Sequence, residues 1–237
     1  MTSERGMSSA GHAAEQAERF VEEVAAVVRP RLRGWIHAGT FPLALMFGAL
    51  LVWLAPAGEP RVASAIYVGA SVLLFGVSAA YHRGTWSPQA FRLLRRLDHS
   101  NIYLLVAGTY TPFALLALPP RDGAVLLAAV WSGAALGVMF RVLRPDAPRW
   151  LYVPLYFLLG WAAIFFLPDL TAGAGLGAIA LLVLGGLLYT AGGIAYAMQR
   201  PDTWPGVWGH HEWFHAATVA AWSAHYVAVS IVVFRAG

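Results

Sequence analysis

Apolar residues dominate the chain from residue 36 onward, in seven runs separated by short stretches rich in Pro and Gly. The runs cover residues 36–55, 62–82, 97–118, 123–142, 151–168, 173–198 and 212–234. Each run is roughly 18 to 26 residues long, so that a helix rising about 1.5 Å per residue can cross a hydrocarbon core of about 30 Å. The pattern therefore predicts an all-α, polytopic membrane protein, a seven-transmembrane helix bundle in residues 35–237.

A different pattern occupies residues 1–34. Between residues 14 and 28, glutamates are set against phenylalanine and valine at a spacing typical of an amphipathic helix that lies along a membrane surface. Pro30 ends this pattern. The segment lacks the basic start, short apolar run and small-residue cleavage site of a signal peptide, so we expect no cleavage. Residues 1–34 are thus predicted to form an N-terminal segment with an interfacial helix.

Composition agrees with a membrane protein. Hydrophobic residues make up 59% of the 237 residues, charged residues make up 12%, and the mean hydropathy is +0.60. These values lie outside the range of soluble globular domains. The chain has no cysteine, which excludes disulfide bonds and thiolate metal sites, so that a zinc site would have to use nitrogen and oxygen ligands.

The distribution of arginine predicts the orientation. All sixteen basic residues are arginine, and thirteen of them fall in the N-terminal segment and the connections on the same side of the membrane. Only Arg61, Arg121 and Arg235 fall on the other side. The positive-inside rule then places the N-terminus in the cytoplasm and the C-terminus outside, in a multi-pass protein of the cell inner (plasma) membrane. This asymmetry also accounts for the net charge of +4 without a nucleic-acid partner.

The candidates for chemistry are polar residues that this topology brings to the cytoplasmic face. His211 and His215 are four residues apart at the start of the last run, so they lie one turn apart on one helix face. His82 ends the second run, four residues after Ser78, and Asp98 begins the third. Because neutral imidazole is the commonest metal-binding side chain, a bundle that brings the three histidines together can bind one metal ion.

Several of these residues also have a structural explanation. The histidine pair can be interfacial, and Asp98 can cap the N-terminus of its helix instead of serving a site. The residues HEWFH, from 211 to 215, also match the HExxH of zinc metalloproteases, in which Glu212 would be the general base. Otherwise Glu212 is expected to lie at the rim or to pair with the helix terminus.

The remaining histidines are assigned to structural positions. His225 lies ten residues beyond the last candidate ligand, which is about 15 Å along a helix and too far to bind the same ion. We therefore expect it to form a hydrogen bond inside the bundle. His37, His99 and His210 lie at the ends of apolar runs and are predicted to be interfacial, and His12 is predicted to be solvated.

Four motifs together resemble one family. These are RLRGWIH from residue 31 to 37, SAAYH from 78 to 82, the run DHSNIYLLVAGTYTPF from 98 to 113, and HEWFH from 211 to 215 followed by His225 and Tyr226. Occurring in this order over several predicted spans, they are similar to the hemolysin III branch of the progestin and adipoQ receptor (PAQR) family, which is related to alkaline ceramidases. Residues 1–30 match no motif of that family.

The resemblance implies a seven-helix bundle with a cytoplasmic N-terminus and a zinc ion near the cytoplasmic surface. Its histidine ligands would be His82, His211 and His215. Its water-holding aspartate would be Asp98, and its motif serine would be Ser78. Three histidines leave the fourth position of a tetrahedral zinc open to water, as catalytic zinc sites do.

Such a site implies a zinc-dependent hydrolase that cleaves an amide (ceramide-like) or ester bond of a membrane lipid arriving from the bilayer. Zinc makes hydroxide available near neutral pH, Asp98 would hold or deprotonate the water, and Ser78 would donate to the oxyanion. The alternatives are a receptor or lipid-sensing, membrane-homeostasis protein with a structural zinc, and a pore-forming hemolysin. A pore is the weaker alternative because no run shows a regular polar stripe. The residues single out no protein partner.

Overall fold

The computed structural model describes residues 30–237, all of whose regular elements are helices. Its elements are α2 (Trp35–Leu54), α3 (Glu59–Arg83), α4 (Pro88–Leu116), α5 (Pro120–Leu143), α6 (Arg149–Gly160), the 3₁₀ helix η1 (Ala162–Phe166), α7 (Leu167–Ala174), α8 (Leu176–Met198) and α9 (His210–Arg235). Six segments are long and apolar enough to cross a membrane, one of them made of α6, η1 and α7 together. The protein is therefore a polytopic helical membrane protein. The amphipathic helix predicted for residues 14–28 and His12 lie outside the described residues.

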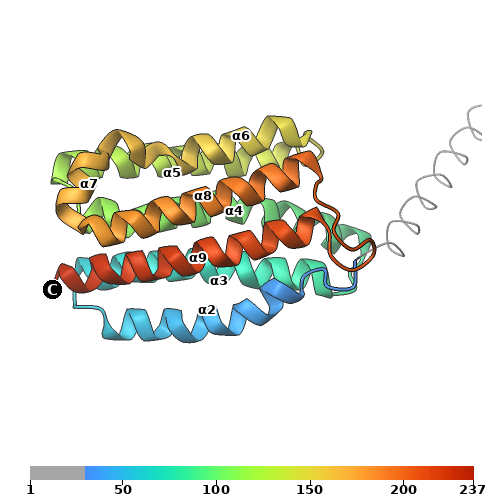
Figure 1. Ribbon diagram of the computed structural model, residues 1–237, viewed down its shortest axis with the longest axis horizontal. Helices are drawn as coiled ribbons and strands as arrows, with labels where there is room; N and C mark the ends of the chain where they lie inside the picture. The colour runs from blue at the N-terminus through green and yellow to red at the C-terminus, as the bar shows by residue number, and fades with distance from the viewer. Residues whose placement is uncertain (1–29) are drawn as a thin grey trace, which may run out of the picture.

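The helices form an elongated bundle in which neighbours in sequence are also neighbours in space (Figure 1). α3 packs between α2 and α4, α5 packs on α4, and α8 packs along α9. α9 also contacts α2, α3 and α4, so that the last helix closes the bundle against the first ones. The start of α2, the end of α3 and the start of α9 all lie at one end of the bundle, and the C-terminus lies at the opposite end (Figure 1).

Helix contacts rely on small residues, as expected where lipid removes the usual hydrophobic drive for association. A side chain at Gly108 would overlap Ala70 of α3, and one at Gly192 would overlap Ala217 of α9. The buried core of the bundle includes Tyr67, Phe75, Tyr103 and Phe113.

α4 begins earlier than the apolar pattern predicts. Ser87 is its N-cap, and the Ser87 hydroxyl accepts a hydrogen bond from the Ala90 N–H at 3.3 Å. Asp98 therefore lies inside the helix, three turns after its start, and the alternative that Asp98 caps a helix N-terminus is wrong. The extra turns were missed because residues 88–96 are rich in arginine and do not read as a membrane segment.

The fifth apolar run is longer than predicted and is interrupted. The prediction ended it at residue 168, but helical structure continues through α7 to Ala174, and the break falls at η1. Tyr110 of α4 supports this break, because its hydroxyl donates to the Gly160 carbonyl at 2.5 Å and accepts from the Ala163 N–H at 3.1 Å. Irregular backbone is tolerated at membrane depth when a neighbouring helix satisfies the freed groups in this way.

Candidate metal centre

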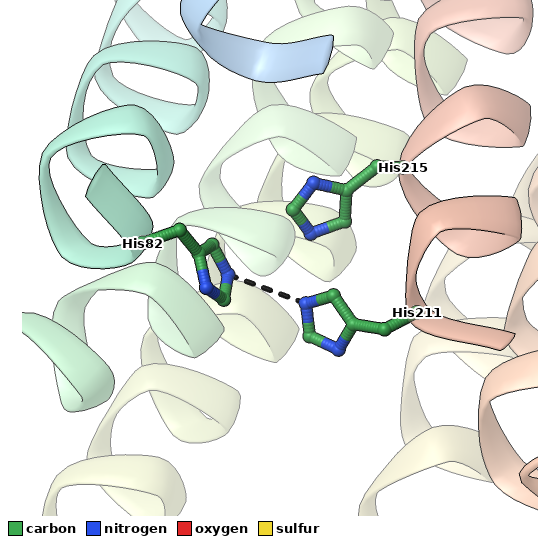
Figure 2. Close-up of side chains that lie close together, drawn as sticks. All are labelled: His82, His211 and His215. Atoms are coloured by element: carbon green, nitrogen blue, oxygen red, sulfur yellow. Dashed lines mark hydrogen bonds between the residues drawn. The ribbon is translucent and has the colours of Figure 1, made fainter. Parts of the chain in front are cut away.

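Three histidines from two helices converge at one end of the bundle. His82 lies in the last turn of α3, and His211 and His215 lie in the first two turns of α9. Figure 2 shows the three rings turned toward a common space. One nitrogen from each ring can be chosen so that all three atoms lie within 4.8 Å of one another. The convergence predicted from the topology is thus present in the structure.

The distances suit a tetrahedral metal ion. The Nε2 atoms of His82 and His211 are 3.2 Å apart. Two nitrogens that each lie 2.0 to 2.1 Å from a tetrahedral zinc ion are separated by about 3.3 Å, which agrees with this value. The His211 and His215 rings follow at a centroid distance of 4.5 Å. The residues present therefore fit an ion bound by three neutral imidazoles, with a fourth position left to a small ligand.

Asp98 and Ser78 lie at the same place, as predicted. Asp98 Oδ2 is 3.8 Å from His82 Nε2, and the Asp98 side chain is largely buried. Ser78, one turn before His82 on α3, is buried as well. Both residues line the same cavity as His211 and His215.

His37 was predicted to be interfacial, and this prediction is wrong. The residue is only 2% exposed, and its ring lies flat against the ring of His215, with centroids 3.8 Å apart and an interplanar angle of 9°. His37 Nδ1 also shares a hydrogen bond of 2.9 Å with Ser78 Oγ. A single histidine near the end of an apolar run has no periodic partner, so spacing alone could not reveal its burial. The one available sign was its place in the RLRGWIH motif.

Glu212 was predicted either to lie at the rim or to pair with the helix terminus, and the structure confirms the pairing with the helix terminus. Its Oε2 accepts the Gly209 N–H at 2.9 Å, and its Oε1 accepts from Arg33 Nε in an ion pair. The rim position is wrong, because Glu212 is only 1% exposed. Because Glu212 is buried and its carboxylate is held by Arg33 and the Gly209 N–H at the helix terminus, its position favours a structural role over that of the general base of an HExxH protease.

A mostly apolar cavity of about 300 Å³ extends from the histidines into the bundle. His215 and Asp98 line one part of it, and Ile164, Leu182 and His225 line others. His225 Nε2 bonds the Leu182 carbonyl at 3.0 Å, which confirms the hydrogen bond expected for it inside the bundle.

The other two histidines predicted to be interfacial lie beside the centre. His99 is half-buried, faces the cavity and bonds the Arg95 carbonyl at 2.7 Å. His210 is half-buried next to the first ligand candidate of α9, and its ring lies 6.4 Å from that of Tyr196. Neither belongs to the group of three that can hold an ion.

Comparison with known proteins identifies the family. Residues 25–226 match the family described as Haemolysin-III related. The chain is 32% identical to the Hemolysin-3 homolog of Bacillus subtilis (strain 168) over 187 residues, which cover 78% of this chain and 84% of that protein.

Eukaryotic relatives extend the likeness. The chain is 29% identical over 195 residues to the Heptahelical transmembrane protein ADIPOR2 of Oryza sativa subsp. japonica, covering 74% of this chain and 83% of the relative. It is 28% identical over 192 residues to the Adiponectin receptor protein of Drosophila melanogaster, covering 73% of this chain and 42% of the relative. With a family match that spans most of its length and relatives in both bacteria and eukaryotes, the chain belongs to the hemolysin III branch of the progestin and adipoQ receptor family.

Proposed function

We propose that this protein is a zinc-dependent hydrolase that cleaves an amide (ceramide-like) or ester bond of a membrane lipid. The observation that carries the proposal is a group of three histidines, two of which line a cavity with mostly apolar walls together with Asp98. A site of imidazole nitrogens with one carboxylate nearby suits zinc, and an open fourth position is typical of catalytic rather than structural zinc. The cavity suits the hydrocarbon part of a lipid.

His82, His211 and His215 would hold the ion through neutral ring nitrogens. When bound, zinc would lower the pKa of a water molecule to about 7 and polarise a carbonyl group. Asp98 would take the proton of the attacking water at a carboxylate oxygen and pass it to the leaving nitrogen or oxygen as the carbon–heteroatom bond breaks. Ser78 Oγ would donate a hydrogen bond to the carbonyl oxygen as negative charge develops there. The apolar walls would hold the acyl chain and exclude bulk water.

The topology belongs to the same proposal. We place α4 in the membrane as a seventh span, because this 29-residue helix packs between α3 and α5 in the middle of the bundle. The arginine asymmetry supports a cytoplasmic N-terminal segment of residues 1–34, an external C-terminus, and insertion of residues 35–237 in the cell inner (plasma) membrane. The metal centre would then face the cytoplasm, since the start of α2 lies at the same end of the bundle. The rice relative is named a heptahelical transmembrane protein, which supports seven spans.

Metal analysis of the purified protein tests the centre. We expect one zinc ion per wild-type chain and its loss from both His82→Ala and His215→Ala. His210→Ala is the matched control, because His210 is adjacent to a proposed ligand yet lies outside the group of three, and it should keep the metal. Retention of zinc by both ligand variants would remove these histidines from the centre.

Hydrolysis of a synthetic ceramide and of an ester lipid tests the reaction. Asp98→Ala should keep zinc and lose at least about 100-fold in rate, the usual contribution of a general base. If the zinc-loaded wild type cleaves neither lipid, the enzyme proposal is wrong while the metal centre stands.

A lipid receptor with a structural zinc is the second candidate. One contact favours it in one tautomer: where His37 Nδ1 accepts, the Ser78 hydroxyl donates to the ring and not to a substrate, whereas a protonated Nδ1 would leave the Ser78 proton free. The similarity to an adiponectin receptor protein points the same way. Zinc in the wild type, saturable lipid binding and no turnover would support the receptor.

A further inference from the structure

We infer that His37, which is not among the proposed ligands, is a positioning residue for the metal centre. It sets the plane of the His215 ring and holds the Ser78 hydroxyl. This inference rests on the proposed function, because it assigns a role toward the metal that His215 would bind.

The first observation is the stack of rings. An imidazole turns about a broad, two-fold torsion, so its ring plane is set by the groups that pack on it and bond to it. His37 covers one face of His215 almost in parallel, at 3.8 Å. Phe75 in turn packs edge-on against His37, with centroids 5.1 Å apart at 82°. The row Phe75, His37, His215 thus directs the edge of the His215 ring toward the other two histidines.

The second observation is how α2 is joined to α9. Arg33, four residues before His37, pairs with Glu212, three residues before His215. Two contacts one turn apart therefore join the start of α2 to the start of α9, and the His37 stack is one of them. The other buried residues of α2 are Thr40, Ala44, Gly48 and Leu51, none of which is ionisable.

The third observation is the cost of a histidine at this position. A buried polar group in a membrane protein loses its hydration, and a leucine or phenylalanine would fill the space without that loss. The hydrogen bond to Ser78 compensates at Nδ1, whereas Nε2 has no hydrogen-bond partner among the described residues. An imidazole at residue 37 is thus explained by what it does to His215 and Ser78 rather than by packing alone.

Two substitutions separate the two contacts. His37→Phe keeps an aromatic face against His215 but loses the hydrogen bond. His37→Asn loses the face but keeps a polar atom where Nδ1 lies, because both atoms are attached to Cγ and the amide can donate or accept. His225→Phe is the matched control, since His225 is also buried and hydrogen-bonded but lies about 15 Å from the centre along α9.

The readout is metal affinity together with the visible spectrum of the cobalt(II)-substituted protein, which reports the geometry of the ligands independently of turnover. We expect His37→Asn to lower the affinity on the order of 10-fold, as the loss of a ligand-orienting residue typically does, and to shift the cobalt bands. His37→Phe should stay within about 3-fold of the wild type with unchanged bands. The His225→Phe spectrum should match the wild type even if that variant is less stable.

The hydrogen bond is tested with a double-mutant cycle on lipid hydrolysis or, for a receptor, on lipid affinity. His37→Phe and Ser78→Ala should each weaken the measured quantity, and the double variant should be no weaker than the worse single variant, because both remove the same bond. If the fold-loss of the double variant equals the product of the two single fold-losses, His37 does not act through Ser78, and that part of the inference is overturned.

Three results decide the rest. The role of the stacked face is overturned if His37→Asn has the metal affinity and cobalt bands of the wild type. It is also overturned if His37→Phe and His37→Asn lose metal affinity equally. If His37→Asn does not fold, Phe75→Leu replaces it, and a cobalt spectrum identical to that of the wild type would then count against the stack. A wild-type protein that binds neither zinc nor cobalt would overturn the proposed function itself, and the inference with it.

Discussion

α9 and the segment made of α6, η1 and α7 are both 26 residues long and both apolar enough to cross a membrane. In an apolar stretch of 18 residues within α9, 50% of the residues are buried inside the bundle. In the corresponding stretch of the other segment, only 11% are buried. Along α9, polar or aromatic polar side chains recur on the buried face every three or four residues, at Glu212, His215, Thr218, Trp222 and His225. The other segment exposes large apolar side chains, among them Leu158, Ile164 and Phe165.

The difference shows what hydropathy leaves out. Overall apolarity finds both segments, but only the spacing of polar residues indicates which face of a span is inside, because a polar group in a membrane needs a protein partner. On α9 the partners of Glu212 and His215 are Arg33, just before α2, and the rings of His37 and His82 at the metal centre, whereas His225 bonds α8 farther along. We therefore expect the contacts that join the starts of α2 and α9 and the end of α3, at the metal centre, to be worth more than those around the break at η1. Three substitutions test this expectation from the largest effect to the smallest.

The largest effect is expected for Arg33→Met. This substitution leaves the Glu212 carboxylate, which is only 1% exposed, with the Gly209 N–H as its one hydrogen-bond donor among residues 30–237. Removing one partner of a buried ion pair costs about 3 to 5 kcal/mol, and since the Arg33 side chain is 22% exposed, we expect about 2 to 3 kcal/mol. The measurement is the free energy of unfolding in detergent.

Asp146→Asn provides the control for the ion pair. It breaks the pair with Arg95, in which the Asp146 side chain is 84% exposed, and should cost less than about 1 kcal/mol. Equal losses in Arg33→Met and Asp146→Asn would show that the contact between α2 and α9 does not fix this end of the bundle.

The second effect is expected for Gly34→Ala. Gly34 precedes α2 with φ at 79°, and a Cβ there would overlap the Cβ of His82. We expect a loss of about 2 kcal/mol, about half from the left-handed backbone and half from the overlap, together with weaker metal binding. Gly206→Ala is the control, because Gly206 has a φ of 76° and open space around it. A Gly206→Ala variant as unstable as Gly34→Ala would mean that the approach of α2 to His82 contributes nothing.

The sequence predicted most of the fold because long apolar runs have few alternatives to spanning helices. The start of α4 was also readable in principle, since Ser87 followed by Pro88 is a favourable helix start. The break at η1 could not be predicted from the sequence. It depends on a hydroxyl from Tyr110, about fifty positions earlier in the chain, and no local pattern announces such a contact.

The candidate site divides in the same way. The five residues were found because each lies near the end of an apolar run and the predicted topology brings these ends together, as the structure does. They are His82, His211, His215, Asp98 and Ser78. His37 and Arg33 were missed for one reason: their importance depends on the rotation of α2 about its axis. Arg33 was counted only as a cytoplasmic charge, and its partner lies 179 positions away. Neither hydropathy nor charge counting specifies such a rotation.

The smallest effect is expected for Tyr110→Phe, the substitution that tests the weaker side of the comparison. At the break, the Ile164 N–H bonds the Trp161 carbonyl instead of continuing the α-helical ladder to Gly160, whose carbonyl accepts from Tyr110. Losing this contact should cost about 1 kcal/mol, the usual scale of a side-chain hydrogen bond in a membrane protein. Relative to the wild type, the rate of amide hydrogen exchange should also increase more at residues 162–166 than in the rest of the chain.

Tyr226→Phe is the control for this substitution. The Tyr226 hydroxyl donates at 2.9 Å to the Phe47 carbonyl inside α2, a group that the helix ladder already engages, so its loss should leave no helix group unpaired. We therefore expect a smaller change in the free energy of unfolding and no local change in exchange. If Tyr110→Phe instead destabilises the protein as much as Arg33→Met, the break at η1 is held as firmly as the histidine end, and burial would be a poor guide to where this bundle is fixed.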